Sequence, residues 1–516
     1  MRAIDFFDRG VFLDPDRLCL KDATVARTYR EVHARSCRIA NAMRRDGVKP
    51  QDKAAVYSPN AAVAFECVLG ILRAGAVWVP INARNVVSEN AYILDYCDVE
   101  TLFYYSGFEG NVDEIRTQCP KLRNFVCIDK PGRNGPHLEA WLGSVDATDP
   151  DIPAKPDDVC AIFSTGGTTG RPKGGMWSHL TYETMVATWH YCMPAKKKPV
   201  HLVVAPMTHG AGVIALILMA TAGTHVILPQ FEAEEVLKAI ERERITQLFL
   251  PPTAIYMLLA HPDIKKYDYS SLEYFIYLAA PMSVEKLKEC LRIFGPVMTQ
   301  SFGQVEAPAI CTFFGADEHV TAMVTGNEKR LASCGRPTLL TPVAIMDDNG
   351  KLLPPGQPGE IVVRGNLVMK GYYKNPQATA EASTFGWHHT GDIGRMDEDG
   401  FVYIIDRKKD MIISGGFNIF ASEVEQVIWS HPSVEDCAVI GVPDEKWGEA
   451  VKAVIQLKPG KSASEEEIIA LCKERIGSMK APKSVEFWDT LPRSPVGKVL
   501  KRSIREKYWQ GRSRAV

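Results

Sequence analysis

The chain has 516 residues, more than a single hydrophobic core usually organises, so two or more domains are expected. Hydrophobic residues make up 46% and charged residues 24%, as in ordinary globular proteins, and a formal net charge of -2 gives no reason to expect a nucleic-acid partner. The 13 cysteines include no Cys-x-x-Cys pair, so we expect reduced thiols in a cytoplasmic protein, without a disulfide framework or a zinc site.

Two segments bear on membranes and targeting. The charged segment 1–10 lacks the apolar run of a signal peptide. The most apolar stretch, 212–228, is interrupted by polar residues and glycine. We expect it to form a buried helix followed by a strand, and no transmembrane segment.

Short apolar runs alternate with amphipathic stretches through the first 300 residues. Strands are expected at 53–57, 76–79, 159–163, 201–205, 225–228, 247–250 and 274–278. Helices are expected at 61–73, 232–244 and 284–294. This order of strand, helix and strand favours parallel sheets covered by helices.

Turn signals become frequent after about residue 337, at 347–350, 354–356 and 397–400. They predict a β-rich subdomain of hairpins over about 338–405. A smaller α+β unit follows, with helices at 422–430 and 464–476 and a strand at 436–442. The predicted fold is therefore α/β, with a large N-terminal domain of parallel βα-type sheets over 1–407 and a small C-terminal domain over 408–516.

A glycine- and threonine-rich segment, 164–174, directly follows the apolar strand at 159–163 and reads STGGTTGRPKG. Glycines let backbone N–H groups approach an anion, and the hydroxyls and Lys173 add donors and charge. The segment thus has the chemistry of a polyphosphate-binding loop. It is not a Walker A loop, because the Gly-Lys-Ser/Thr order is absent, and this argues against a P-loop kinase.

The loop resembles the phosphate loop of the adenylate-forming superfamily, which includes acyl-CoA synthetases, peptide-synthetase adenylation domains and luciferases. Further motifs follow in the family order: QSFGQVE at 300–306, TGD at 390–392, DRKKD at 406–410 and PVGK at 495–498. By this resemblance Phe302 stacks on adenine, Glu306 binds magnesium, Asp392 binds ribose, and Lys498 is the catalytic lysine. The cofactors implied are ATP, Mg²⁺ and coenzyme A, the last as a co-substrate.

These roles also make chemical sense for adenylation, in which a carboxylate attacks the α-phosphorus of ATP. Two anions must meet, so cations and a metal are needed to offset their repulsion. Lys498 could bridge the two anions, and Glu306 could hold Mg²⁺ through oxygen ligands. Asp392 can accept hydrogen bonds from both ribose hydroxyls, and Arg407 offers a planar fork of donors.

The resemblance also assigns the acyl and thiol sites. The segment 206–212 resembles the family motif at the wall of the acyl pocket, which makes His209 a substrate contact and a candidate catalytic residue. SGGFN at 414–418 resembles the stretch that lines the pantetheine channel. Lys409 matches the hinge about which the small domain rotates between the two reactions. The predicted cofactor-binding residues are Thr165, Gly166, Gly167, Thr168, Thr169, Gly170, Lys173, Ala280, Ser301, Phe302, Gly303, Asp392, Arg407 and Gly416.

Two positions depart from the family pattern. Val305 stands where a threonine hydroxyl usually contacts the α-phosphate, and Phe302 replaces a tyrosine. A valine methyl cannot donate a hydrogen bond, so another group must supply that contact or it is missing.

The sequence predicts an ATP-dependent carboxylic acid:CoA ligase whose partner is a small-molecule acid. One alternative is a stand-alone adenylating enzyme that transfers the acyl group to an amine or a carrier protein. We expect CoA, because no carrier segment follows Lys498 and no aspartate follows His209 to pair with an amino group. A second alternative, a non-catalytic nucleotide-binding protein, is disfavoured by the presence of Glu306, Asp392 and Lys498 together. The acid could be fatty, aromatic or alicyclic, and a homodimer is the default expectation.

Overall fold

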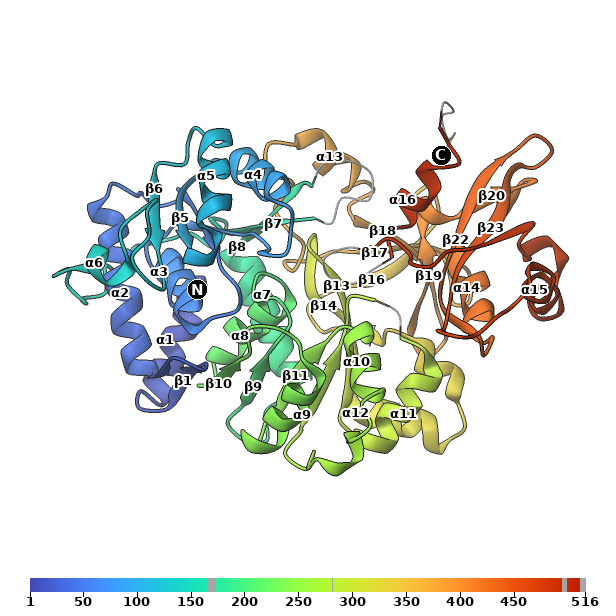
Figure 1. The fold of residues 1–516 in the computed structure, drawn as a ribbon, viewed down its shortest axis with the longest axis horizontal. Helices are drawn as coiled ribbons and strands as arrows, with labels where there is room; N and C mark the ends of the chain where they lie inside the picture. The colour runs from blue at the N-terminus through green and yellow to red at the C-terminus, as the bar shows by residue number, and fades with distance from the viewer. Residues whose placement is uncertain (166–171, 281, 494–498, 511–516) are drawn as a thin grey trace. The chain divides into compact units, whose positions relative to one another are not determined.

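The computed structural model describes residues 1–165, 172–280, 282–493 and 499–510 (Figure 1). Its contacts group the chain into two compact units. The first contains the described residues of 1–343 together with 363–388, and the second contains 344–362 and the described residues of 389–510. The β-rich stretch is thus divided between the units, and the predicted boundary after Arg407 stays a prediction.

A six-stranded sheet with the order β6-β5-β3-β4-β7-β8 forms one half of the first unit. All its neighbouring strands are parallel except the β7–β8 pair at the edge. Helices α4 (Val87–Tyr96) and α5 (Glu109–Gln118) lie together beside β5 (Figure 1), and their side chains Leu94 and Ile115 are buried in one core with Leu102. The strands are β3 (Lys53–Tyr57), β4 (Val77–Pro80), β5 (Val99–Tyr104), β6 (Asn124–Cys127), β7 (Val159–Ser164) and β8 (Gly174–Ser178).

The other half of the first unit is a nine-stranded sheet with the order β15-β14-β13-β12-β11-β9-β10-β1-β2. Its central strands β13, β12, β11, β9, β10 and β1 are parallel, and antiparallel strands close both edges. The strands are β1 (Leu18–Lys21), β2 (Ala26–Thr28), β9 (Val200–Val203), β10 (Thr224–Ile227), β11 (Gln247–Leu250), β12 (Tyr274–Tyr277), β13 (Met298–Gln304), β14 (Ala307–Phe314) and β15 (Arg336–Pro337).

Helices follow the strands of the first unit in the βα rhythm. Several begin at a capping residue: the Thr28 side chain accepts from the Glu31 N–H at the start of α2, in a capping box with that glutamate. The long helices of this unit are α1 (Ala3–Leu13), α2 (Tyr29–Arg45), α3 (Ala62–Arg73), α7 (His179–Cys192), α8 (Gly210–Met219), α9 (Ala233–Arg242), α10 (Pro252–Leu259), α11 (Val284–Phe294) and α12 (Ala316–Val324). The short helices are α6 (Leu138–Leu142) and α13 (Pro376–Glu381).

The second unit is built on two smaller sheets. A four-stranded sheet has the order β16-β17-β18-β19, and a five-stranded sheet has the order β21-β20-β23-β22 with β24 beside β23. The side chains of α14 and α15 share a core with the second of these sheets. The elements are β16 (Val343–Met346), β17 (Gly359–Val363), β18 (His388–Met396), β19 (Val402–Arg407), β20 (Ile412–Ser414), β21 (Phe417–Ile419), α14 (Ala421–Trp429), β22 (Val434–Asp444), β23 (Gly448–Leu457), α15 (Glu465–Lys480), β24 (Ser484–Phe487) and α16 (Lys501–Glu506).

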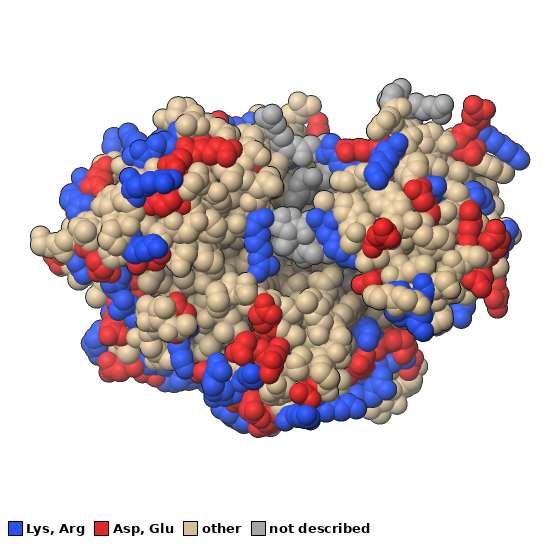
Figure 2. Space-filling model, viewed as in Figure 1, with Lys and Arg blue, Asp and Glu red and all other residues tan. Residues whose placement is uncertain are grey.

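The predicted α/β class and the expected strands and helices are confirmed, with bounds that shift by a few residues. The apolar stretch 212–228 forms most of α8 and then β10, as expected. Among the residues described here, no helix is both long and apolar enough to cross a membrane. Figure 2 shows Lys and Arg side chains interspersed with Asp and Glu over the visible face.

Candidate functional site

The base of the glycine-rich loop is closed by two hydrogen bonds between its ends. Strands β7 and β8 pair with Ser164 opposite Gly174. Beyond this pair, the Thr165 N–H donates to the Lys173 carbonyl at 2.8 Å, and the Lys173 N–H donates to the Thr165 hydroxyl at 3.2 Å. The loop therefore starts and ends on one hairpin, unlike a Walker A loop, which joins a strand to a helix. The predicted phosphate contacts of Gly166, Gly167, Thr168, Thr169 and Gly170 fall outside the described residues.

The segment 300–306 ends β13 and forms the turn to β14. Gln304 pairs with Ala307, so Val305 and Glu306 are the turn residues. A Cβ on Gly303 would lie 2.7 Å from the Ala309 nitrogen, a contact too close for any residue but glycine. The chain thus needs glycine there to bring the two strands together.

Two predicted nucleotide contacts lie on the same strand. The Ser301 hydroxyl is buried and donates to the Ala309 carbonyl at 2.8 Å, so it stabilises the hairpin. The Phe302 ring is half-buried. The nucleotide contacts of both residues stay predictions.

The Glu306 carboxylate is held by a tyrosine that the sequence analysis did not single out. The Tyr372 hydroxyl donates to Glu306 Oε1 at 2.6 Å, and the Met369 N–H donates to the Glu306 carbonyl at 2.8 Å. On the ring face of Tyr372, the Lys173 Nζ lies 4.7 Å from the centroid. Burial, together with the nearby carboxylate, raises the pKa of Tyr372 well above its ordinary value, so the phenol remains a neutral donor. One ring therefore joins the predicted metal ligand to the lysine of the glycine-rich loop.

Tyr372 and Glu306 are 66 residues apart, which is why the motifs gave no sign of this contact. The available signal was a pair of tyrosines after a glycine, in KGYY at 370–373.

Ala280 lies in the connection after β12, where the preceding residue has an unusual backbone. Ala279 is in the left-handed region with φ of 76°, a conformation that costs a non-glycine residue about 1 kcal/mol. Ala279 is exposed and Ala280 is half-buried. Strained backbone of this kind is frequent at functional sites, and the nucleotide contact of Ala280 stays a prediction.

His209 immediately precedes α8, and its ring is exposed. Its Nδ1 lies 3.1 Å from the Thr208 hydroxyl. Behind it, a Cβ on Gly212 would lie 1.7 Å from the Met207 carbonyl, so the glycine lets the chain turn into the helix. An exposed histidine at a helix start is compatible with a substrate contact, which stays a prediction.

In the second unit, Asp392 and Arg407 lie opposite each other on β18 and β19. Arg407 Nε is 2.7 Å from Asp392 Oδ1, with the carboxylate buried and the guanidinium group partly exposed. The strand is fixed nearby, because the Thr390 hydroxyl donates to the Ile361 carbonyl at 2.7 Å and accepts from the Asp392 N–H. The structure thus brings together two residues predicted from separate motifs.

Gly415 and Gly416 form the turn between β20 and β21, with Ser414 paired to Phe417. Both have positive φ, 58° and 83°, as a two-residue type I′ hairpin turn requires. A Cβ on Gly415 would lie 2.6 Å from the ring of Trp447, whereas one on Gly416 would meet no atom within 4 Å. Gly416 therefore leaves open space beside a partly exposed tryptophan.

The hinge candidate Lys409 lies in a short 3-10 helix, Lys408–Asp410. Arg505 of α16 binds this segment: its Nη1 donates to the Lys409 carbonyl at 3.1 Å, and its Nη2 contacts Asp410 Oδ1 at 2.7 Å. Helix α16 begins at Lys501, three residues after Lys498. Lys498 itself falls outside the described residues, so its catalytic role and the hinge role of Lys409 stay predictions.

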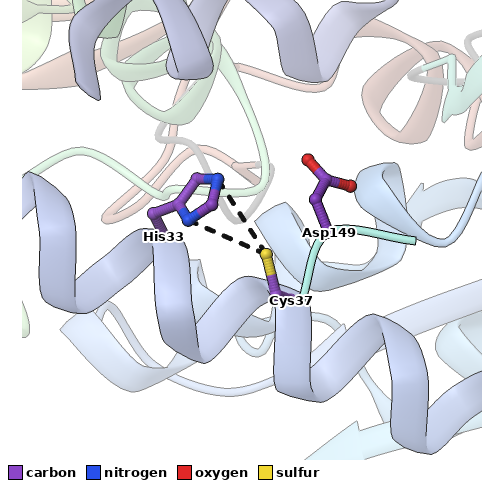
Figure 3. A group of neighbouring side chains, drawn as sticks. All are labelled: His33, Cys37 and Asp149. Atoms are coloured by element: carbon purple, nitrogen blue, oxygen red, sulfur yellow. Dashed lines mark hydrogen bonds between the residues drawn. The ribbon is translucent and has the colours of Figure 1, made fainter. Parts of the chain in front are cut away.

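A separate group of potential metal ligands occurs in the first unit. Figure 3 shows His33 and Cys37, both on α2, with Asp149 beside them. The buried guanidinium group of Arg73 is already ion-paired with Asp149 and Asp8. Burial and the Arg73 charge lower the pKa of His33. Since Arg73 supplies the positive charge here, we interpret the group as a structural ion-pair network.

The chain matches two family models: that of the AMP-binding enzymes over residues 7–373 and that of the AMP-binding enzyme C-terminal domain over residues 423–498. The medium/long-chain-fatty-acid–CoA ligase FadD8 of Mycobacterium tuberculosis is 43% identical over 377 residues, which cover 71% of this chain and 64% of that relative. A feruloyl-CoA synthase of an Amycolatopsis species is 36% identical over 508 residues, covering 97% of this chain and 98% of the relative.

Solved structures also resemble the chain over nearly its whole length. The amide bond synthetase McbA from Marinactinospora thermotolerans has a TM-score of 0.88 and 28% identity, covering 98% of this chain and 100% of that one. ATP-bound MatB from Rhodopseudomonas palustris has a TM-score of 0.89 and 28% identity, covering 98% and 99%. The family match over most of the chain and the relatives aligned along its length show that it belongs to the AMP-binding enzymes, the adenylate-forming superfamily, in the branch of AMP-forming acyl-CoA synthetases.

Proposed function

We propose that the protein is an ATP-dependent carboxylic acid:CoA ligase that forms an acyl-adenylate and pyrophosphate, and then acyl-CoA and AMP. The observation that carries the proposal is the Tyr372 ring, with the Lys173 ammonium on its face and the Glu306 carboxylate on its hydroxyl. The Lys173 ammonium, which could bind phosphate, and the Glu306 carboxylate, which could bind a metal, thus both contact the same tyrosine side chain. Adenylation needs both charges at one place, because it brings two anions together.

In the first step, an oxygen of the substrate carboxylate attacks the α-phosphorus, and the bond to the pyrophosphate oxygen breaks. Lys173 and Lys498 would offset the negative charge of the phosphates and the entering carboxylate. Asp392 would accept hydrogen bonds from the ribose hydroxyls, with Arg407 keeping the carboxylate in place. In the second step, the sulfur of CoA attacks the acyl carbon, the thiol proton is lost, and AMP leaves.

Glu306 fits a magnesium ion by its chemistry. It presents a carboxylate from a hairpin turn, and the Tyr372 hydroxyl that donates to it is neutral and leaves the negative charge in place. Magnesium prefers one or two carboxylates together with phosphate oxygens and water. When bound, the ion would neutralise phosphate charge and orient the leaving pyrophosphate.

Coenzyme A is the acceptor best supported. The Gly415–Gly416 turn leaves open space beside Trp447, as the passage of a thin thiol arm would require. FadD8 and feruloyl-CoA synthase, at 43% and 36% identity, are named as a CoA ligase and a CoA synthase, whereas the amide bond synthetase McbA is 28% identical. The names of these relatives include a fatty and an aromatic acid, and we propose a fatty, aromatic or alicyclic carboxylic acid as the substrate.

The test is pyrophosphate release with ATP and Mg²⁺ across a panel of fatty, aromatic and alicyclic acids, each with and without CoA. We expect turnover that requires CoA and yields AMP and an acyl thioester with one class of acid. An adenylate that CoA does not discharge, but an amine or a carrier protein does, would establish the alternative instead.

Lys498→Ala provides a second test. We expect acid-dependent exchange of pyrophosphate into ATP to fall by roughly a hundredfold or more, because one such electrostatic contact is worth about 3 kcal/mol in the transition state. Nucleotide binding, measured by calorimetry, should be largely retained. Near-normal exchange in this variant would refute the assignment of Lys498.

A further inference from the structure

The Glu306 carboxylate extends from a hairpin turn, a position where a side chain is not fixed by its own backbone. A metal ligand must be held close to its productive geometry, and neighbouring hydrogen bonds usually provide this. The Tyr372 hydroxyl, at 2.6 Å from Oε1, supplies such a bond. The Tyr372 side chain is itself buried, with 9% of its surface exposed, so the phenol has little freedom to move away.

Tyr372 is in turn tied to the strand that follows the glycine-rich loop. The backbone of 370–373 is bonded to β8: the Met176 N–H donates to the Gly371 carbonyl at 3.0 Å, and the Tyr373 N–H donates to the Gly174 carbonyl at 2.7 Å. The Tyr372 N–H donates to the Thr379 hydroxyl at 2.8 Å. The segment that holds Glu306 is therefore an added edge of the loop's own hairpin.

The β13–β14 turn is also joined to the same strand, through a side chain of β8. The Trp177 indole on β8 donates to the Val305 carbonyl at 2.7 Å, and its ring stacks on Phe163 of β7 with centroids 3.9 Å apart. The Met369 N–H holds the carbonyl of Glu306 itself. The backbone at Val305 and Glu306 is thus fixed, and the carboxylate is fixed separately by Tyr372.

The neighbouring Tyr373 makes a similar bond with a different consequence. Its hydroxyl donates to Asp98 Oδ2 at 2.7 Å, but Asp98 is also ion-paired with Lys374, at 2.6 Å, and with Lys121. Two ammonium groups neutralise that carboxylate. The Tyr372 hydroxyl that donates to Glu306 is neutral, so the negative charge of that carboxylate remains available to a cation.

We propose that Tyr372 is a positioning residue for metal binding, which orients the Glu306 carboxylate without neutralising it and couples it to the phosphate loop through β8. The inference rests on the proposed function in one respect, namely that the metal is Mg²⁺ bound together with ATP. This role also accounts for the contact between the Lys173 ammonium and the face of the Tyr372 ring. Through these two contacts, one side chain sets the distance between Lys173 and Glu306.

The experiment compares Tyr372→Phe with Tyr373→Phe, which each remove one tyrosine hydroxyl that donates to a carboxylate from a partly buried position. The Mg²⁺ concentration for half-maximal pyrophosphate exchange should rise about tenfold in Tyr372→Phe, because a hydrogen bond to a charged group is lost. In Tyr373→Phe it should change by less than about twofold. Equal shifts in the two variants would overturn the proposal, and thermal unfolding shows whether either variant is merely destabilised.

Two further measurements separate the inference from the proposed activity. Calorimetry of ATP binding with Mg²⁺ and with EDTA needs neither acid nor CoA, and Tyr372→Phe should lose most of the gain in affinity that Mg²⁺ provides. In a Glu306→Gln background, Tyr372→Phe should have little further effect, since it acts through that carboxylate. An undiminished effect there would assign Tyr372 a role independent of Glu306. If no acid supports exchange in wild type, the ligase proposal fails, while the binding data still decide the role of Tyr372.

Discussion

Two groups of polar side chains, at the carboxyl and the amino ends of strands in the nine-stranded sheet, differ in exposure and in hydrogen bonding. At the carboxyl end of β13, Glu306 is bonded to Tyr372 on a partly exposed turn. At the amino ends of β9, β10 and β11, His201, His225 and Gln247 form a row across the sheet and are completely buried. Ligands of open α/β sheets bind at the carboxyl ends of the strands, so position favours the first group as functional.

The partners of the two groups differ as well. The two histidines contact each other through Nδ1 atoms 3.4 Å apart. Within the described part of the chain, both Nε2 atoms and both amide atoms of Gln247 lack a hydrogen-bond partner. The row therefore has polar atoms that the core does not satisfy, whereas Glu306 has a partner and access to solvent. Histidines are common catalytic residues, but burial and location place this pair in the core.

The largest effect should come from Glu306→Gln, which keeps the size of the side chain and removes its charge. We expect pyrophosphate exchange to fall by about a hundredfold, or about 3 kcal/mol in transition-state stabilisation, with a higher Mg²⁺ requirement. The free energy of unfolding should change little, because the carboxylate is not part of the core. Normal exchange in this variant would show that the carboxyl end of β13 is not where the metal binds.

The opposite result is expected from the histidine row, where replacement should alter stability and spare activity. Burial lowers the pKa of His201 to about 3, and burial, then His201 and Arg17, lower that of His225 well below its ordinary value. Above about pH 6.5 both side chains are neutral whether the protein is folded or unfolded. In that range the two histidines therefore do not lower the free energy of unfolding. As pH falls below 6.5, only the unfolded chain takes up protons, and each histidine reduces stability by about 1.4 kcal/mol per pH unit.

The double variant His201→Leu/His225→Leu removes both partners together, so neither is left unpaired. Between pH 6 and 5, wild type should lose about 3 kcal/mol per pH unit more than this variant. Urea unfolding followed by tryptophan fluorescence measures the difference, and pyrophosphate exchange at pH 7.5 should be retained. Parallel pH dependence in the two proteins would show that these histidines do not titrate on unfolding.

The sequence predicts local elements well and long-range contacts poorly. The strands Lys53–Tyr57 and Gln247–Leu250 form at the expected residues, because each is an apolar run bounded by turns. The pairing of β1 with β10, and the order of the parallel strands within each sheet, depend on contacts between segments far apart in the sequence. No periodicity within a segment encodes such pairing.

The same limit holds at the site. The motif that contains Asp392 and the one that contains Arg407 were identified separately, and their contact follows from the register of β18 and β19. The bond between Tyr372 and Glu306 spans two motifs, of which only one was recognised. The His201–His225 pair was included in two predicted strands without any sign that the side chains meet, since this depends on their register in the sheet.

The smallest effect concerns Val305, where the family usually has threonine. The backbone is fixed by Trp177, and a Cβ on Gly175 would lie 2.7 Å from Val305 Cγ1, so the side chain is packed against β8. Threonine has nearly the same shape, and its hydroxyl could donate to the α-phosphate.

We expect Val305→Thr to raise the rate of pyrophosphate exchange about fivefold, the effect of one hydrogen bond worth about 1 kcal/mol. Val305→Ala, which adds no donor, should not raise it. An unchanged or lower rate in Val305→Thr would mean that another group already supplies this contact at the carboxyl end of the sheet.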